Sequence, residues 1–264
     1  MVTLPPRPAA EGIWHRWHAQ PILALAVPPL AGTLVVQVAG DALTGGLAGP
    51  VPVGSLVGGG GPLLGRARSG ELLPATDLGW RLPTPRQLWL TTGIALAALP
   101  PASLLAELSL RLRPADPEWV RLVNEQMPRG AGPFVLAALA MVIVAPLVEE
   151  IIFRALLQRL AARYWGALPG ALVSALLFGL VHLEPWYVLG LIGVGLMLAL
   201  VWAGTRSLPA CWLAHALHNG VSLALLADAG GVTGEPGDLA VRDLLLAGGG
   251  LAIVAILGRN LLRR

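Results

Sequence analysis

The chain has 264 residues, of which 55% are hydrophobic and only 12% are charged, with a formal net charge of +3 and a mean hydropathy of +0.71. Soluble globular proteins carry about 25% charged residues, so this composition excludes an ordinary soluble domain and indicates an integral membrane protein. All 18 basic residues are arginines that lie beside apolar segments, which favours contact with lipid head groups and argues against nucleic-acid binding.

A spanning helix needs about 20 mostly apolar residues. The sequence therefore predicts an all-α fold, a polytopic transmembrane helix bundle of seven to eight spans with the active site inside the bundle. The seven clearest spans cover residues 21–39, 87–106, 133–149 (continuing beyond 149), 168–182, 186–204, 208–227 and 239–258. The first follows Arg16 and is predicted to be an uncleaved signal anchor, because a secretory apolar segment is usually shorter.

The connections divide the chain into three regions without an internal repeat. Residues 1–132 form an N-terminal region with two predicted spans, a Gly/Pro-rich loop at 45–74 and a charged connection at 111–129 that we expect to be partly an interfacial helix. Residues 133–227 form the core, and residues 228–264 form a loop, the last span and a basic tail.

Arginine placement gives a partial orientation. If the last five spans alternate, Arg159, Arg206 and the C-terminal arginines share one side, which the positive-inside rule places in the cytoplasm. The same alternation places Arg111 and Arg129 outside, against the rule, unless the N-terminal third holds an extra span. The arginine-only, Ala- and Gly-rich composition is typical of a bacterial coding bias, so we expect a multi-pass protein of the bacterial inner membrane.

Ionisable side chains within apolar segments are costly, and each is a candidate for function. Glu149 and Glu150 follow an apolar run and point about 100° apart on a helix, so they are expected to have different roles. Arg154 lies four residues after Glu150 and can pair with it, which leaves Glu149 facing elsewhere. The alternative is that the helix simply leaves the membrane here.

Two further clusters contain histidine. Phe178 precedes His182 by four residues, and His215 precedes Asn219 by four, so that each pair shares a helix face. His218 lies about 60° from His215. Polar side chains of this kind also join membrane helices by hydrogen bonds.

The spacing of the clusters predicts that they meet. Residues 165–169 mark a helix–helix turn, and Glu149 and His182 are equally far from it in sequence. In an antiparallel hairpin with a rise of about 1.5 Å per residue, the two side chains are expected to face each other, with His215 at a similar depth.

The ordered set Glu149-Glu150-x-x-x-Arg154, Phe178-x-x-x-His182 and His215-x-x-x-Asn219 resembles the three motifs of the CPBP (CAAX-protease/bacteriocin-processing, Abi) family, which includes the Ras-converting CAAX prenyl proteases. The resemblance covers about residues 133–227. It implies an intramembrane endopeptidase in which Glu149 and His182 activate water and His215 and Asn219 stabilise the oxyanion. It also implies supporting roles for Glu150, Arg154 and Phe178.

The chemistry leaves alternatives open. Glu149, His182 and His215 are also a plausible zinc ligand set, although we expect no cofactor. Cys211 lies four residues before His215 and is a weaker candidate nucleophile. A non-enzymatic carrier or an immunity protein is a further alternative. The expected partners are the lipid bilayer and a peptide or membrane-protein substrate.

Overall fold

The computed structural model describes residues 74–125 and 127–263, and this part of the chain is helical without any strand. Its helices are α5 (Pro74–Asp77), α6 (Pro85–Ala97), α7 (Leu99–Leu112), α8 (Pro117–Glu125), α9 (Ala131–Ala138), the π-helical η2 (Leu139–Val144), α10 (Ala145–Glu150), the π-helical η3 (Ile151–Gln158), α11 (Arg159–Trp165), α12 (Ala167–Val181), α13 (Val188–Thr205), α14 (Leu208–Ala229) and α15 (Val241–Leu262). The first predicted span and the glycine-rich segment after it lie outside the described residues, apart from Pro74.

Five helices in the described part are long and apolar enough to cross a membrane: Pro85–Leu112, Ala131–Trp165, Val188–Thr205, Leu208–Ala229 and Val241–Leu262. The shorter apolar helix α12 lies at the fourth predicted span, residues 168–182. The all-α prediction is confirmed, and these six helices follow the predicted order. The helix that contains the two glutamates runs to Trp165, so it continues beyond residue 149 as predicted, and the carboxylates lie within it.

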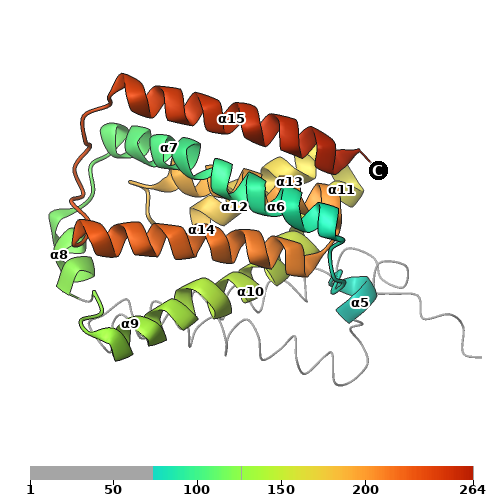
Figure 1. Ribbon diagram of the computed structural model, residues 1–264, viewed down its shortest axis with the longest axis horizontal. Coiled ribbons are helices and arrows are strands. Elements are labelled where there is room, and N and C mark those ends of the chain that lie inside the picture. The colour runs from blue at the N-terminus through green and yellow to red at the C-terminus, as the bar shows by residue number, and fades with distance from the viewer. Residues whose placement is uncertain (1–73, 126, 264) are drawn as a thin grey trace, which may run out of the picture.

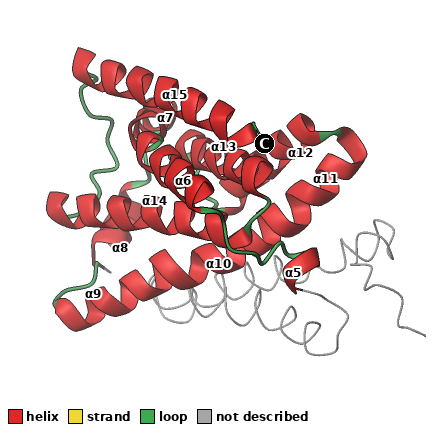
Figure 2. Cartoon of the chain, turned by 45° about the vertical axis from the view of Figure 1, so that its right-hand side comes forward, coloured by secondary structure: helices red, strands yellow, loops and turns green. Residues whose placement is uncertain are grey.

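The helices lie lengthwise in one bundle. Figure 1 shows α6 and α7 nearly in line between α15 and α14, with α9 and α10 on the other side of α14. Figure 2 shows α11 and α12 joined at one end of the bundle. The turn between them is the predicted one, and Gly166 makes it with a φ of +93°, a conformation that favours glycine.

Small residues bring the central helices close together. A Cβ atom on Gly195 of α13 would lie 2.9 Å from the Cα of Ala175 in α12, and one on Gly190 would lie 2.8 Å from the Cβ of Ala106 in α7. Close backbone approach of this kind is the usual basis of helix packing in membranes, where the hydrophobic effect between helices is lost. It holds α12, which carries two motif residues, against α13.

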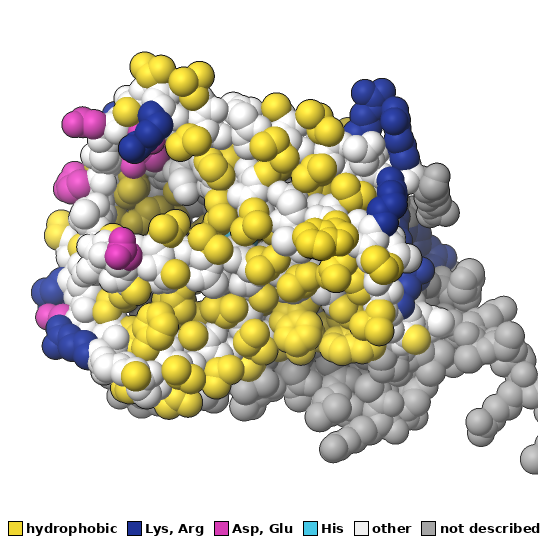
Figure 3. All heavy atoms as spheres, in the orientation of Figure 1, with side chains coloured by type: hydrophobic (Ala, Val, Ile, Leu, Met, Phe, Trp, Pro, Cys, Tyr) yellow, Lys and Arg dark blue, Asp and Glu magenta, His cyan; other side chains and the backbone are white. Residues whose placement is uncertain are grey.

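Charged side chains gather at the two ends of the bundle, and an apolar surface lies between them (Figure 3). In the described residues, one end carries nine carboxylates and five arginines: Glu107, Asp116, Glu118, Glu125, Glu184, Asp228, Glu235, Asp238, Asp243, Arg111, Arg113, Arg121, Arg129 and Arg242. The other end carries seven arginines and one carboxylate: Arg81, Arg86, Arg159, Arg163, Arg206, Arg259, Arg263 and Asp77.

The connection between α7 and α9 lies at the acidic end. It contains the expected short helix, α8, and its described residues include no helix long enough to span. Arg111 and Arg129 therefore lie on the outer side if the C-terminus is cytoplasmic. Arg111 pairs with Glu107, and Arg121 pairs with both Glu118 and Glu125. Much of the positive charge on this side is thus compensated locally.

Candidate active site

Two adjacent glutamates lie at the centre of a helix that is not a regular α-helix. The α-helical turn α10 carries them, and the π-helical segments η2 and η3 flank it. Pro146 explains part of this irregularity, since proline has no N–H to donate to a carbonyl one turn earlier and its ring crowds that turn. π-Helical turns are rare and often occur at functional sites.

Glu150 and Arg154 form an ion pair inside the bundle. Arg154 Nε lies 3.0 Å from Glu150 Oε2, and neither side chain is exposed at all. A second guanidinium nitrogen of Arg154 donates to Ser174 Oγ at 2.9 Å, and that hydroxyl donates to the Phe153 carbonyl at 2.8 Å. The pairing expected from the sequence is present, and Ser174 of α12 ties it to a second helix.

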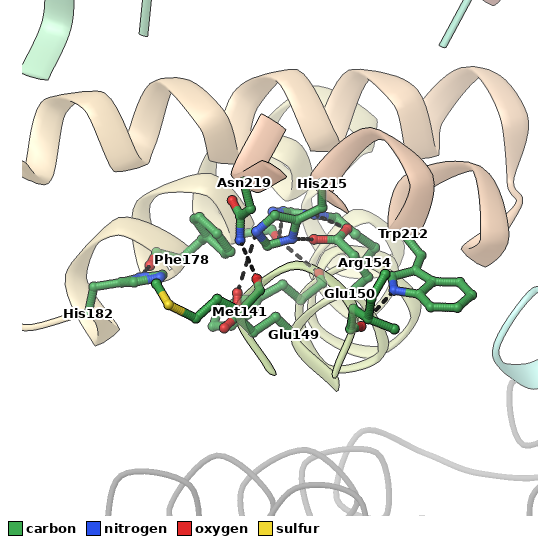
Figure 4. A network of polar contacts seen from close by, with 12 residues as sticks. Met141, Glu149, Glu150, Arg154, Phe178, His182, Trp212, His215 and Asn219 are labelled. Carbon is green, nitrogen blue, oxygen red and sulfur yellow. Dashed lines mark hydrogen bonds and ion pairs between the residues drawn. The ribbon is translucent and has the colours of Figure 1, made fainter. Parts of the chain in front are cut away.

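Glu149 differs from its neighbour in access and in contacts. Its side chain is 22% exposed, whereas that of Glu150 is fully buried. The Oε2 atom of Glu149 lies 3.7 Å from Nε2 of His215, and Nδ1 of the same imidazole lies 2.9 Å from Oε1 of Glu150. The ring of His215 is thus held between a buried carboxylate and an accessible one (Figure 4).

The Phe178 ring packs against the charged residues of this network. Its centroid lies 5.2 Å from the Arg154 guanidinium carbon, 5.5 Å from the His215 ring and 4.8 Å from the His182 ring. A cation over an aromatic face is attracted to it, and more strongly where water is excluded. The Phe178 ring therefore forms an apolar side of the network and also attracts the Arg154 guanidinium.

His182 lies at the edge of the network and has different neighbours from those expected. Its Nδ1 is 2.7 Å from the Phe178 carbonyl, and no hydrogen bond or ion pair among the described residues joins it to Glu149. Glu184 lies two residues after His182, in the loop outside the spans. Burial raises the pKa of its carboxyl, and the nearby His182 acts in the opposite direction. The expected direct contact between Glu149 and His182 is absent from this structure.

Asn219 faces the glutamate-bearing helix rather than His215. Its Nδ2 donates to the Met141 carbonyl at 3.0 Å, and Trp212 Nε1 donates to the Ile143 carbonyl at 2.8 Å. Both acceptors belong to η2, where the Ala145 N–H bonds the carbonyl five residues earlier. By the same spacing, Pro146 has no N–H to donate to the Met141 carbonyl. Two side chains of α14, seven residues apart and on one face, thus hold the segment that precedes the glutamates.

Sequence reasoning missed Ser174 and Trp212. A serine in an apolar helix and a tryptophan near a helix start are both common, and neither pattern indicates a partner. Pro146 within an apolar span did indicate that a carbonyl needs a donor from another helix, which Asn219 supplies to Met141, but it indicated neither Ser174 nor Trp212.

The remaining candidates lie apart from the carboxylates. Cys211 is completely buried, and both ring nitrogens of His215 point to glutamates, so no contact joins the thiol to that imidazole. His218 lines a separate cavity on the side of α7 and α13. Among the described residues, no three His, Cys, Asp or Glu side chains are grouped so as to hold a metal ion. Glu149, His182 and His215 therefore do not fit a zinc site in this arrangement.

Arg154→Ala should destabilise the protein strongly, because it leaves Glu150 as a buried charge without its main partner. The expected loss is roughly 3–5 kcal/mol, measurable as a lower Tm in detergent together with reduced activity. Arg259→Ala, at an exposed arginine of α15, is the matched control and should change the Tm little. An Arg154→Ala protein as stable as the wild type would contradict the supporting role.

Trp212→Phe should lower the Tm by a few degrees, since it keeps the ring but removes one hydrogen bond worth about 1 kcal/mol. Trp165→Phe is the control, because Trp165 is 63% exposed. Equal Tm values for the two variants would show that the bond to the Ile143 carbonyl does not hold η2.

Comparison with known proteins identifies part of the chain. Residues 131–221 match the family model described as type II CAAX prenyl endopeptidase Rce1-like. No curated protein and no solved structure matches the chain. The matched segment contains α9 to α13 and most of α14, and therefore all seven motif residues. The motif resemblance and the family match agree, and the segment of residues 131–221 belongs to the CPBP family of CAAX proteases.

Proposed function

We propose that the protein is an intramembrane endopeptidase that hydrolyses a peptide bond with water activated by Glu149. The family match implies a protease. The observation that carries the assignment is the contrast between the two glutamates, because only Glu149 is both partly exposed and unpaired with arginine. A general base must reach its water, which the partly exposed Glu149 can do and the fully buried Glu150 cannot.

His215 donates a hydrogen bond to the oxyanion that forms when the activated water attacks the peptide carbonyl. In the bond to Glu150, its Nδ1–H donates to the carboxylate, which fixes the ring and directs Nε2 toward Glu149. When the ring carries two protons, both nitrogens donate, and Nε2–H is then free to bind the oxyanion of the tetrahedral intermediate. The carboxylates on both sides compensate the imidazolium charge, and the preformed geometry avoids reorganisation during the reaction.

The remaining motif residues complete the proposal. His182 assists Glu149 after a small approach or through a bridging water, since it lies beside the same Phe178 ring. Asn219 has a second N–H on the nitrogen that holds the Met141 carbonyl, and this N–H is the second oxyanion donor. The substrate is a peptide or membrane protein that meets these residues within the bilayer. We infer seven to eight spans in a bacterial inner membrane.

Glu149→Gln tests the base. The amide has nearly the same size but cannot accept the proton, so hydrolysis should fall by about 10² or more while the Tm stays at the wild-type value. Glu150→Gln is the matched control on the neighbouring residue and should lower the Tm, because it weakens the buried ion pair. The assay follows cleavage of a membrane-protein library by mass spectrometry. Undiminished turnover by Glu149→Gln would rule out the assignment.

Asn219→Ala tests the oxyanion donor. Loss of one such donor should reduce kcat by about 10² to 10³ with little change in KM, because the hydrogen bond strengthens only in the transition state. Trp212→Phe removes the neighbouring brace on η2 without touching the proposed oxyanion. An equal loss of kcat in both variants would assign Asn219 to bracing alone.

Metal analysis of the same preparations tests the zinc alternative. In the glutamate mechanism, activity survives strong chelators in wild type. One zinc ion per chain that is lost together with activity in His215→Ala, yet retained in Asn219→Ala, would establish the metal-dependent mechanism instead.

A further inference from the structure

A cavity lies beside the face of α14 that carries His215 and Asn219, which we call the catalytic face. The proposed mechanism does not use this cavity. It has a volume of about 180 Å³ and lies between α7, α13 and α14. Figure 3 shows the surface hollowed between α7 and α14. Its walls include Ala102, Ser103, Tyr187, Gly190, His218 and Ser222. The cavity is open to the surface, where Ser103 and Ser222 are exposed. Since an enclosed cavity of about 150 Å³ holds one benzene molecule, this space is large enough for a single amino-acid side chain.

The chemistry of the walls is polar but uncharged. Three hydroxyl groups and one imidazole face an otherwise apolar space, and none of the described residues that line it is charged. His218 Nδ1 is buried and has no hydrogen-bond partner in the described part of the chain. An unsatisfied polar group in an apolar bundle is unfavourable, so the cavity favours a ligand that forms hydrogen bonds. A charged ligand would find no counter-charge in the wall itself, although Glu107 and Glu184 lie near Tyr187.

Helix geometry places this cavity next to the catalytic residues. At about 100° per residue, Ser222 lies about 20° from His215 around α14, and His218 lies about 60° away on the same side. Asn219 lies about 40° away on the other side. The face that lines the cavity is therefore continuous with the catalytic face. Tyr187 also follows His182 by only five residues, at the acidic end of the bundle.

We propose that this cavity is a specificity subsite of the peptidase, which accepts one uncharged polar side chain of the substrate, of the size of threonine, asparagine or glutamine. The proposal rests on the proposed peptidase function. Ser222 lies about 10 Å from His215 along the axis of α14, and an extended peptide advances about 3.3 Å per residue. The recognised side chain is thus one to three residues from the scissile bond, on the side toward the acidic end.

Cleavage of synthetic apolar peptides in liposomes tests the subsite. In one series of spanning peptides, asparagine occupies each position in turn, and the matched peptide has leucine at that position. The cleaved bonds are mapped by mass spectrometry. Wild type should cut bonds within one to three residues of the asparagine about fivefold faster than the same bonds in the leucine peptide, as expected for one net hydrogen bond. Ser222→Leu and Ser103→Leu fill the cavity from two helices, and each should abolish the preference while retaining cleavage of the leucine peptide.

Ala227→Leu is the matched control, because Ala227 is exposed on the same helix and does not line the cavity. It should keep the asparagine preference. Equal rates for the two peptides in wild type, or a preference that survives both filling variants, would overturn the subsite.

A binding measurement separates the subsite from the hydrolysis. Cys211 is the only cysteine, so Ser222→Cys combined with Cys211→Ala and Glu149→Gln places a single thiol in the cavity of a protein that binds without cutting. The asparagine peptide should slow modification of this thiol by a methanethiosulfonate reagent, and the leucine peptide should not. Equal protection by the two peptides, or none, argues against the subsite even if Glu149-dependent cleavage is found. Selective protection without any Glu149-dependent cleavage would keep the subsite and refute the peptidase.

Discussion

Glu150 and Arg154 are both completely buried among apolar helices. Removing two such ions from water costs several kcal/mol for each ion, and their attraction offsets this only when the geometry is good and the remaining polar atoms have partners. Partners for most of these atoms come from elsewhere in the chain, namely Ser174 on α12 and His215 on α14, whereas Nη2 of Arg154 has no hydrogen-bond partner among the described residues. The relative placement of three helices is therefore constrained by the need to satisfy one ion pair, and the candidate active site is formed where they meet.

The same constraint explains why two neighbouring glutamates have different chemistry. Both oxygens of Glu150 are occupied, one by Arg154 and the other by His215. About 100° around the helix, Glu149 has neither partner at hydrogen-bond distance and is partly exposed. The buried carboxylate orients the imidazole, and the imidazole is then available to the accessible carboxylate. A water molecule that reaches Glu149 therefore meets an imidazole whose orientation is already fixed.

Local patterns predicted the helices, the turn at Gly166 and the pairing of Glu150 with Arg154, because each depends on a few neighbouring residues. The match of residues 131–221 supports the family that the motifs indicated. Contacts between helices were less predictable. The expected approach of Glu149 and His182 assumed a regular α-helical rise, but η3 is π-helical over eight residues. Its wider turns advance less per residue along the axis, so equal distance from the turn no longer means equal depth.

Helix α14 connects these features, because one helix carries His215, braces η2 through two donors and lines the neighbouring cavity. Its orientation about its own axis must satisfy all three at once. The start of the helix limits that rotation, since the Ser207 hydroxyl accepts a hydrogen bond from the Ala210 N–H and donates one to the Arg81 carbonyl. A capped N-terminus tied to the segment before α6 thus fixes the angle at which the catalytic face meets Glu149. The brace on η2 fixes the same angle two turns further along.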